Sequence, residues 1–297
     1  MTTTAAKANS VRPVVEVVTT ERMLEGGGFP VRRPFPTARL LQVDPFLLLD
    51  HLGPVKWGPG QGIGAPDHPH RGFETVTYLL SGEMQHKDSA GHSGKLGPGD
   101  VQWMTAGAGV VHSELPSDAF MQNGGTMHGF QIWVNLPRRD KMIRPRYQDI
   151  PAARIPGAAS ADGKVRVRVI AGEALGQAAV IETHTPIIYL HFTLQPGGEI
   201  VHPVPENHNT FVYVIQGELR TGDEGRRVRE GQMAHFGAGD TVRLAIDEDA
   251  AGPVDLLLLA GVPLNEPVER YGPFVMNTRD EIMQAIHDYH DGRMGSI

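Results

Sequence analysis

The sequence predicts an all-β chain built from two similar domains, with a short helix at the C-terminal end. Glycine and proline are abundant, at 36 and 23 of 297 residues, which favours many turns over long helices. Short β-branched and aromatic runs recur between turn signals at a spacing of roughly ten residues, which is typical of β-sandwiches and barrels. The third observation is a repeat. Residues 75–83 (TVTYLLSGE) return as 210–218 (TFVYVIQGE), a strand followed by a Gly-Glu turn in both places.

The first domain is predicted to span residues 11–136. Its strands are bounded by glycine and proline turns, and we expect them at 11–18, 45–52, 75–80, 84–88, 101–104, 110–114 and 127–136. His51, His128 and Gln131 lie on two of these strands. We interpret them as packed residues with hydrogen-bonded polar tips rather than as members of a site.

Residues 137–163 are predicted to be a linker, because this stretch is rich in proline and alanine and carries clustered arginine and lysine. We interpret the basic cluster as a solvated face. The second domain is predicted at 164–297 and ends in a helix over 279–290. Thr278 and Glu281 have the spacing of a capping box. Apolar residues then recur every three or four positions and form one stripe: Ile282, Ala285, Ile286 and Tyr289.

The composition narrows the possible classes of function. A net charge of −7 argues against binding nucleic acid through a basic surface. Cysteine is absent, which excludes disulfides and thiolate metal sites and fits a reducing compartment. No run is long enough to span a bilayer, and residues 1–10 lack the apolar core of a signal peptide. We therefore expect a cytoplasmic protein with no membrane partner and no direct nucleic-acid partner.

Two pairs of potential metal ligands are the strongest functional signal. The pairs are His68 with His70, and His112 with Glu114, and each lies on a predicted strand next to glycine turns. Because side chains alternate along a strand, both members of a pair face the same side. Three imidazoles and one carboxylate leave positions for exchangeable ligands and suit Fe(II), Mn, Ni, Cu or Zn. The alternative is that these histidines bind backbone groups and fix loops.

The second domain carries different residues at the corresponding positions. The repeat aligns Pro203 and Pro205 with the first pair, and Leu244 and Ile246 with the second. We therefore predict that this domain keeps the fold and has lost the metal. An alternative ligand set is off the His-x-His register and is less favoured: His202, His208 and His235.

Five long strings of the chain resemble one known family. They are PFLLLDHLG from Pro45, HPHRGFETVTY from His68, PGDVQWMTAG from Pro98, VHSE from Val111 and YGPFVMNT from Tyr271. They are similar to pirins, a family of bacterial and eukaryotic bicupins, and the similarity runs from about residue 11 to the final helix. The resemblance implies two jelly-roll (cupin) barrels, with one metal, usually iron, in the N-terminal barrel.

The resemblance also implies roles for individual residues. The metal ligands would be His68, His70, His112 and Glu114, with Glu74 nearby but not coordinating. Some pirins open flavonols such as quercetin with O₂. The resemblance implies this chemistry here, with Fe(II) as the first choice of metal and Mn, Ni, Cu, Co or Zn as alternatives. Glu74 or Glu114 would act as the catalytic base.

Two other functions stay open at this point. Other pirins are described as transcriptional co-regulators, and in this alternative the metal stabilises the barrel or senses redox state while a surface contacts a protein partner. A Mn or Zn centre that isomerises or decarboxylates a sugar or an acid is the third reading. No DNA-reading element is recognisable in the sequence, so direct DNA binding is not expected.

Overall fold

The computed structural model describes residues 10–297. The prediction that residues 1–10 are not a signal peptide therefore falls almost entirely outside the described residues. The chain forms two compact units. The unit that we call the N-terminal barrel comprises Thr20–Ile155, Val180–Thr185 and Leu264–Ile297. Of the described residues, the C-terminal barrel comprises 10–19, Pro156–Ala179 and Pro186–Pro263. The predicted fold class, two β-barrels with a short C-terminal helix, is confirmed.

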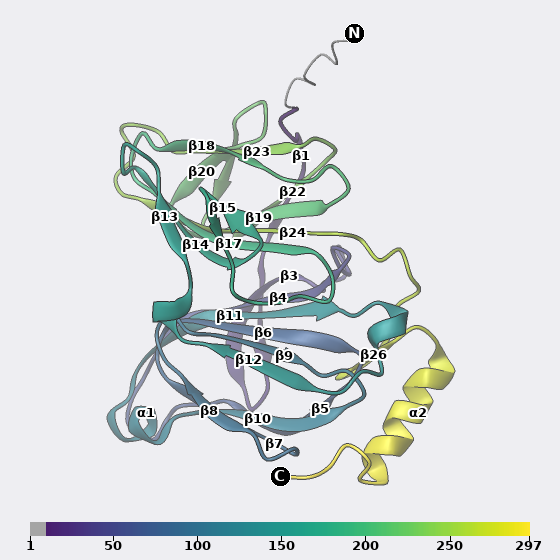
Figure 1. The fold of residues 1–297 in the computed structure, drawn as a ribbon. Coiled ribbons are helices and arrows are strands. Elements are labelled where there is room, and N and C mark those ends of the chain that lie inside the picture. Colours follow the sequence, from purple (N-terminus) through teal and green to yellow (C-terminus); the bar gives the residue numbers. More distant parts are fainter. Residues whose placement is uncertain (1–9) are drawn as a thin grey trace. The chain divides into compact units, whose positions relative to one another are not determined.

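The N-terminal barrel consists of two antiparallel sheets (Figure 1). The larger sheet has the order β12-β9-β6-β11-β4-β3-β2 and the smaller one the order β5-β10-β7-β8. The strands are β2 (Glu21–Glu25), β3 (Phe29–Phe35), β4 (Phe46–Trp57), β5 (Ala65–His70), β6 (Phe73–Ser81), β7 (Met84–Asp88), β8 (Ser93–Leu96), β9 (Val101–Thr105), β10 (Val110–Pro116), β11 (Gly125–Asn135) and β12 (Arg146–Ile150). Short helices lie between strands: α1 (Asp118–Asn123), η1 (Arg138–Asp140) and η2 (Ala152–Arg154).

The C-terminal barrel repeats this layout, as the sequence repeat predicts. Its sheets have the orders β1-β22-β19-β24-β17-β14-β13 and β18-β23-β20-β21, and β15 pairs with β16. The strands are β1 (Val14–Thr19), β13 (Gly157–Ala159), β14 (Val165–Ala171), β15 (Glu173–Ala174), β16 (Gln177–Ala178), β17 (Ile187–Leu194), β18 (Glu199–Pro203), β19 (Asn209–Gln216), β20 (Glu218–Thr221), β21 (Arg226–Arg229), β22 (Gln232–Phe236), β23 (Thr241–Ala245) and β24 (Val254–Gly261).

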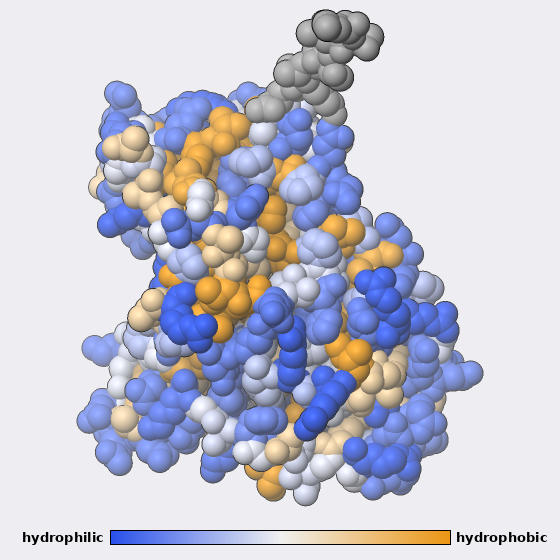
Figure 2. Space-filling view, viewed as in Figure 1, coloured by the Kyte–Doolittle hydropathy of each residue, from blue (hydrophilic) through white to orange (hydrophobic). Residues whose placement is uncertain are grey.

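Apolar side chains fill the interior of the C-terminal barrel. Its core is a large cluster of buried aliphatic and aromatic side chains that includes Leu244 and Ile246, the residues aligned with the second ligand pair. His202 is also buried, with its ring against Phe192 at 5.9 Å between centroids. Outside these cores, hydrophilic residues cover most of the face seen in Figure 2, as expected for a chain with 21% charged residues. Within residues 10–297, no helix has the length and apolar character needed to cross a membrane.

The compact units differ from the contiguous boundaries 11–136 and 164–297 at both ends of the chain. β1 belongs to the C-terminal barrel because it pairs with β22, Val17 lying opposite Ala234. The predicted linker, 137–163, is not free chain: β12 extends the sheet of one barrel, and β13 extends that of the other. Hydrogen bonding of these edge strands, which composition does not reveal, accounts for the difference.

The C-terminal segment belongs to the N-terminal barrel. It contains β25 (Glu269–Tyr271), β26 (Phe274–Met276) and α2 (Arg279–His290), with the bounds predicted for the helix and the predicted capping box of Thr278 and Glu281. Figure 1 shows α2 beside β26. The helix buries Ile282 and Ala285 in a cluster with Val111 of β10. A buried ion pair of 2.7 Å between Arg71 and Asp288 adds a second attachment.

Candidate metal centre

Neighbouring strands bring the two ligand pairs together. β5 and β10 are antiparallel partners, with His68 opposite His112 and His70 opposite Val110. Residues directly opposite each other point to the same face of a sheet, so the three histidines share one face. The register shifts between His112 and Glu114, which lies opposite Ala65. The predicted strand positions of both pairs are therefore present, and a bulge displaces the last member.

The three histidines form a compact cluster. Their rings pack with centroids 4.4–4.9 Å apart, and their potential ligand atoms all lie within 4.8 Å of one another. His68 Nε2 is 3.0 Å from His70 Nε2, while His68 Nδ1 lies 2.7 Å from the carbonyl oxygen of Pro66. Because a carbonyl only accepts, His68 carries its proton on Nδ1 and leaves Nε2 free to ligate.

Buried ring nitrogens of His70 and His112 have no hydrogen-bond partner among the described residues. For His112 this holds for both ring nitrogens. Burial lowers the pKa of His70 and of His112 well below the usual histidine value, and the neighbouring imidazoles lower both further. Neutral buried imidazoles with unused nitrogens are the form that binds a metal. The residues present therefore fit one metal ion.

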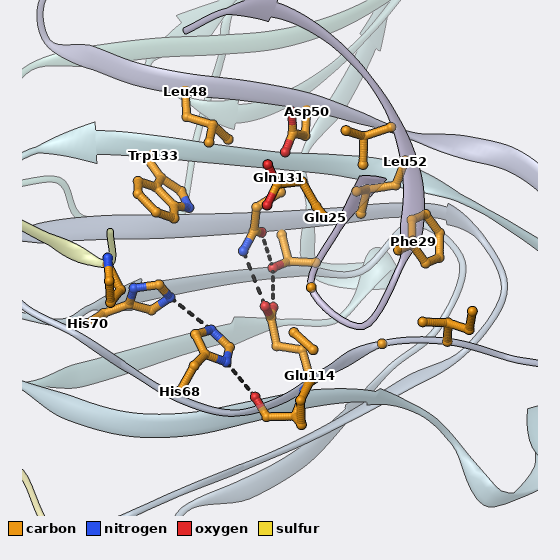
Figure 3. A pocket seen from close by; sticks show the side chains of 18 of the residues that line it. Glu25, Phe29, Leu48, Asp50, Leu52, His68, His70, Glu114, Gln131 and Trp133 are labelled. Atoms are coloured by element: carbon orange, nitrogen blue, oxygen red, sulfur yellow. Dashed lines mark hydrogen bonds between the residues drawn. The ribbon is translucent and has the colours of Figure 1, made fainter. Parts of the chain in front are cut away.

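Glu114 faces the same cavity but is held by other side chains. The Thr77 hydroxyl is 2.9 Å from Glu114 Oε1, and Gln131 donates to Oε2 at 3.3 Å (Figure 3). The group whose ligand atoms lie within 4.8 Å of one another contains the three histidines and not Glu114. Coordination by Glu114 stays a prediction. Gln131, which we expected in the core packing, lines the cavity.

The structure separates Glu74 from the cavity. Thr77 of β6 lines the cavity, and Glu74, an odd number of residues before it, lies on the opposite face of the strand. The fully buried Glu74 carboxylate accepts a 2.7 Å hydrogen bond from Thr105, its neighbour on β9. The sequence prediction of Glu74 as catalytic base is therefore not supported, because a base must reach the substrate.

Burial gives Glu74 a testable effect on stability instead. Desolvation raises its pKa to about 7, although the hydrogen bond from Thr105 opposes the shift. In the unfolded chain a glutamate titrates near pH ~4.3, so between these pH values the folded state keeps a proton that the unfolded state has released. The free energy of unfolding therefore falls as the pH rises from about 4 to about 7.

We expect Glu74→Gln to remove this loss of stability. At pH 8 the variant should be more stable than the wild type by about 3–4 kcal/mol, and near pH 4 the two should be alike. Urea unfolding followed by tryptophan fluorescence tests this in the N-terminal barrel, because Trp57, Trp103 and Trp133 all belong to that unit. A stability difference that does not change with pH would contradict the assignment.

A cavity of about 520 Å³ opens in front of the histidines. Its wall is mostly apolar and includes Phe29, Leu48, Leu52 and Trp133 (Figure 3). The Trp133 ring lies 5.3 Å from the His70 ring, between centroids. Deeper in the wall, Arg33 makes a two-pronged contact with Asp50, both hydrogen bonds 2.6 Å long. A cavity of this size with a mostly apolar wall is suited to a small, largely apolar ligand.

The C-terminal segment completes the mouth of this cavity with Arg270, Gly272 and Pro273. Sequence reasoning missed these residues because no local pattern connects them to the histidine strands, about 200 positions earlier. Their attachment is specific. The backbone of Val275 donates to the Arg71 carbonyl at 3.0 Å, directly after His70. A Cβ atom at Gly72 would collide with the Val275 carbonyl, so this approach requires glycine.

Lys141 also attaches the C-terminal segment to the N-terminal barrel. Its ammonium group is buried and donates to the carbonyls of Gly72 and Val275 and to Asn135 Oδ1, at 2.7–3.1 Å. Burial lowers its pKa to about 8. The interpretation of the basic cluster as a solvated face is wrong for this residue, because it ties β26 to the barrel.

Comparison with known proteins agrees with this geometry. The chain matches the family model described as Pirin over residues 28–134 and the model described as Pirin C-terminal cupin domain over 189–295. It is 46% identical to a pirin-like protein of Solanum lycopersicum (96% of this chain and 93% of the relative) and 43% identical to pirin of Homo sapiens (96% and 95%). A crystal structure of quercetin 2,3-dioxygenase from Acinetobacter baumannii superposes with a TM-score of 0.90 at 41% identity, covering 97% of this chain and all of that one.

Proposed function

The chain belongs to the pirin family, and from this premise we propose that it is a metal-dependent dioxygenase that opens flavonols such as quercetin with O₂. The observation that carries the proposal is the cluster of His68, His70 and His112, of which His70 and His112 are buried, beside a cavity with an apolar wall. The likeness to a structure named quercetin 2,3-dioxygenase supports the same reaction class.

We propose one metal per chain, held by His68, His70 and His112, with Glu114 as the fourth ligand. Fe(II) is the first choice, and Mn, Ni, Cu, Co and Zn are alternatives that the same nitrogen and oxygen donors accept. When bound, such an ion supplies Lewis acidity, which favours the deprotonated form of a flavonol hydroxyl, and the open positions that O₂ chemistry needs.

The chain's own residues prepare the substrate. The apolar wall, with Trp133 beside His70, packs against the flat rings and excludes water from them. Glu114 is placed to accept the proton of a hydroxyl that enters the cavity, when its carboxylate is not coordinating. Thr77 and Gln131 hold that carboxylate in place, so its position does not depend on the substrate. Proton transfer then needs no large movement of the side chain.

The test begins with anaerobic loading of the purified protein with Fe(II), followed by measurement of metal content by mass spectrometry. Quercetin absorbance and dissolved O₂ are then recorded together after air is admitted. One metal per chain with equal losses of quercetin and O₂ is the expected result. One metal per chain without turnover would contradict the proposal. It would favour a non-catalytic metal-binding protein, such as a transcriptional co-regulator or redox sensor, that acts through protein partners.

A further inference from the structure

Arg270 is a charged group at the mouth of the cavity with unused hydrogen-bonding capacity. It lines the cavity, is exposed, and lies on β25. Its guanidinium carbon lies over the Trp133 ring, 4.6 Å from the ring centroid. Among residues 10–297 it makes no direct hydrogen bond or ion pair, although the carboxylates of Glu25 and Asp50 act on its charge from a greater distance. A guanidinium stacked on an aromatic ring keeps its N–H groups in the plane free for an incoming acceptor.

The other charged side chains deeper in the cavity already have partners. Arg33 is bound by Asp50 and by Glu25, with ion-pair distances of 2.6 Å to each. Glu114 accepts hydrogen bonds from Thr77 and Gln131. Asp67 also lines the cavity, but it is exposed, and water and salt weaken its effect. Arg270 is therefore the group in this wall that is best suited to bind an anion.

The position of Arg270 limits the length of the ligand. The guanidinium is 4.6 Å from the Trp133 ring centre, and that centre is 5.3 Å from the His70 ring, so Arg270 and His70 are at most about 10 Å apart. Both groups border the indole of Trp133, which offers an apolar surface. An aromatic compound that packs on this surface reaches both the histidines and Arg270.

We propose that Arg270 determines specificity by binding a carboxylate on an aromatic substrate that packs against Trp133, beside the cluster of His68, His70 and His112. The proposal rests on the proposed function, since it assigns the substrate class of the same cavity. A guanidinium offers two parallel N–H donors that match the two carboxylate oxygens, and this pairing is stronger than one with a neutral group. Aromatic acids should therefore be preferred over neutral aromatic compounds of the same shape.

The test compares two probe compounds, 3-hydroxyflavone and 3-hydroxyflavone-4′-carboxylate, by anaerobic isothermal titration calorimetry with the metal-loaded protein. We expect the wild type to bind the carboxylate about fivefold to tenfold more tightly, and this ratio to fall in 0.5 M salt. Arg270→Gln should bring the ratio close to one. Arg270→Lys should give an intermediate ratio, because it keeps the charge but loses the paired donors. The matched control is Arg22→Gln, an exposed arginine on β2 outside the cavity lining, which should keep the wild-type ratio.

Equal affinity of the wild type for the two compounds would overturn the proposal, as would an unchanged ratio in Arg270→Gln. Binding is measured without O₂, so it does not depend on turnover. A carboxylate preference without quercetin oxidation would leave the role of Arg270 standing and reject the dioxygenase. Quercetin oxidation without a carboxylate preference would support the dioxygenase and reject the role of Arg270. In an active enzyme, Arg270→Gln should raise KM for the carboxylate more than for the neutral compound, with little change in the kcat ratio.

Discussion

His70→Ala is expected to reduce metal affinity by more than about 100-fold and to abolish flavonol oxidation. Loss of a residue that only supports a metal ligand already costs about 10- to 100-fold in affinity or activity, and His70 belongs to the cluster itself. The remaining imidazoles of His68 and His112 would also face the vacated space without a third donor. Metal content after gel filtration in the presence of a weak chelator, together with O₂ uptake, measures both effects.

A second histidine variant controls for general loss of imidazole. His290 is exposed at the end of α2 and lies outside the cavity, so His290→Ala should keep the wild-type metal content and activity. Circular dichroism should show the same β-sheet content in both variants, because the strand pairing of β5 with β10 is made by the backbone and not by the His70 side chain. Tight metal binding by His70→Ala would contradict the ligand assignment.

Local sequence patterns were sufficient for the histidine strands and for the final helix. The period of two along a strand correctly placed His68 and His70 on one face, and the antiparallel pairing of β5 with β10 brought His112 to them. The repeat of residues 75–83 at 210–218 predicted two barrels, whose sheets have the same strand order apart from the edge strands β12 and β1. These features depend on neighbours in the chain or on a pattern that occurs twice.

Features that depend on distant segments were beyond such patterns. Nothing near Arg270 indicates that β25 reaches the mouth of a cavity built from strands of the first half of the chain. The exchange of β1 into the C-terminal barrel has the same origin, since the pairing partner β22 is more than 200 residues away. Glu74 shows a different limit. The period of two along the strand already puts Glu74 and Thr77 on opposite faces. Only the structure of the closed barrel shows which of these two faces lines the cavity.

The second large effect is expected from Glu114→Gln, which should lower kcat for quercetin by about 10²- to 10⁴-fold, the usual contribution of a general base. Glutamine has the shape of glutamate and still offers an oxygen to Thr77, so the side chain should stay in place while its ability to take a proton is lost. Glu74→Gln is the matched control: it makes the same change in the same barrel, on the face of β6 away from the cavity, and should retain kcat.

Metal content then separates the two roles proposed for Glu114. If it acts as the base alone, Glu114→Gln should lose turnover and keep one metal per chain on the three histidines. If it is the fourth ligand, metal affinity should fall together with turnover, because an amide is a weaker donor than a carboxylate for a divalent cation. Wild-type kcat in Glu114→Gln would reject both roles. If Glu74→Gln lost kcat instead, Glu74 would be the catalytic base. The face of β6 that carries Glu74 would then have to be the one that contacts the substrate.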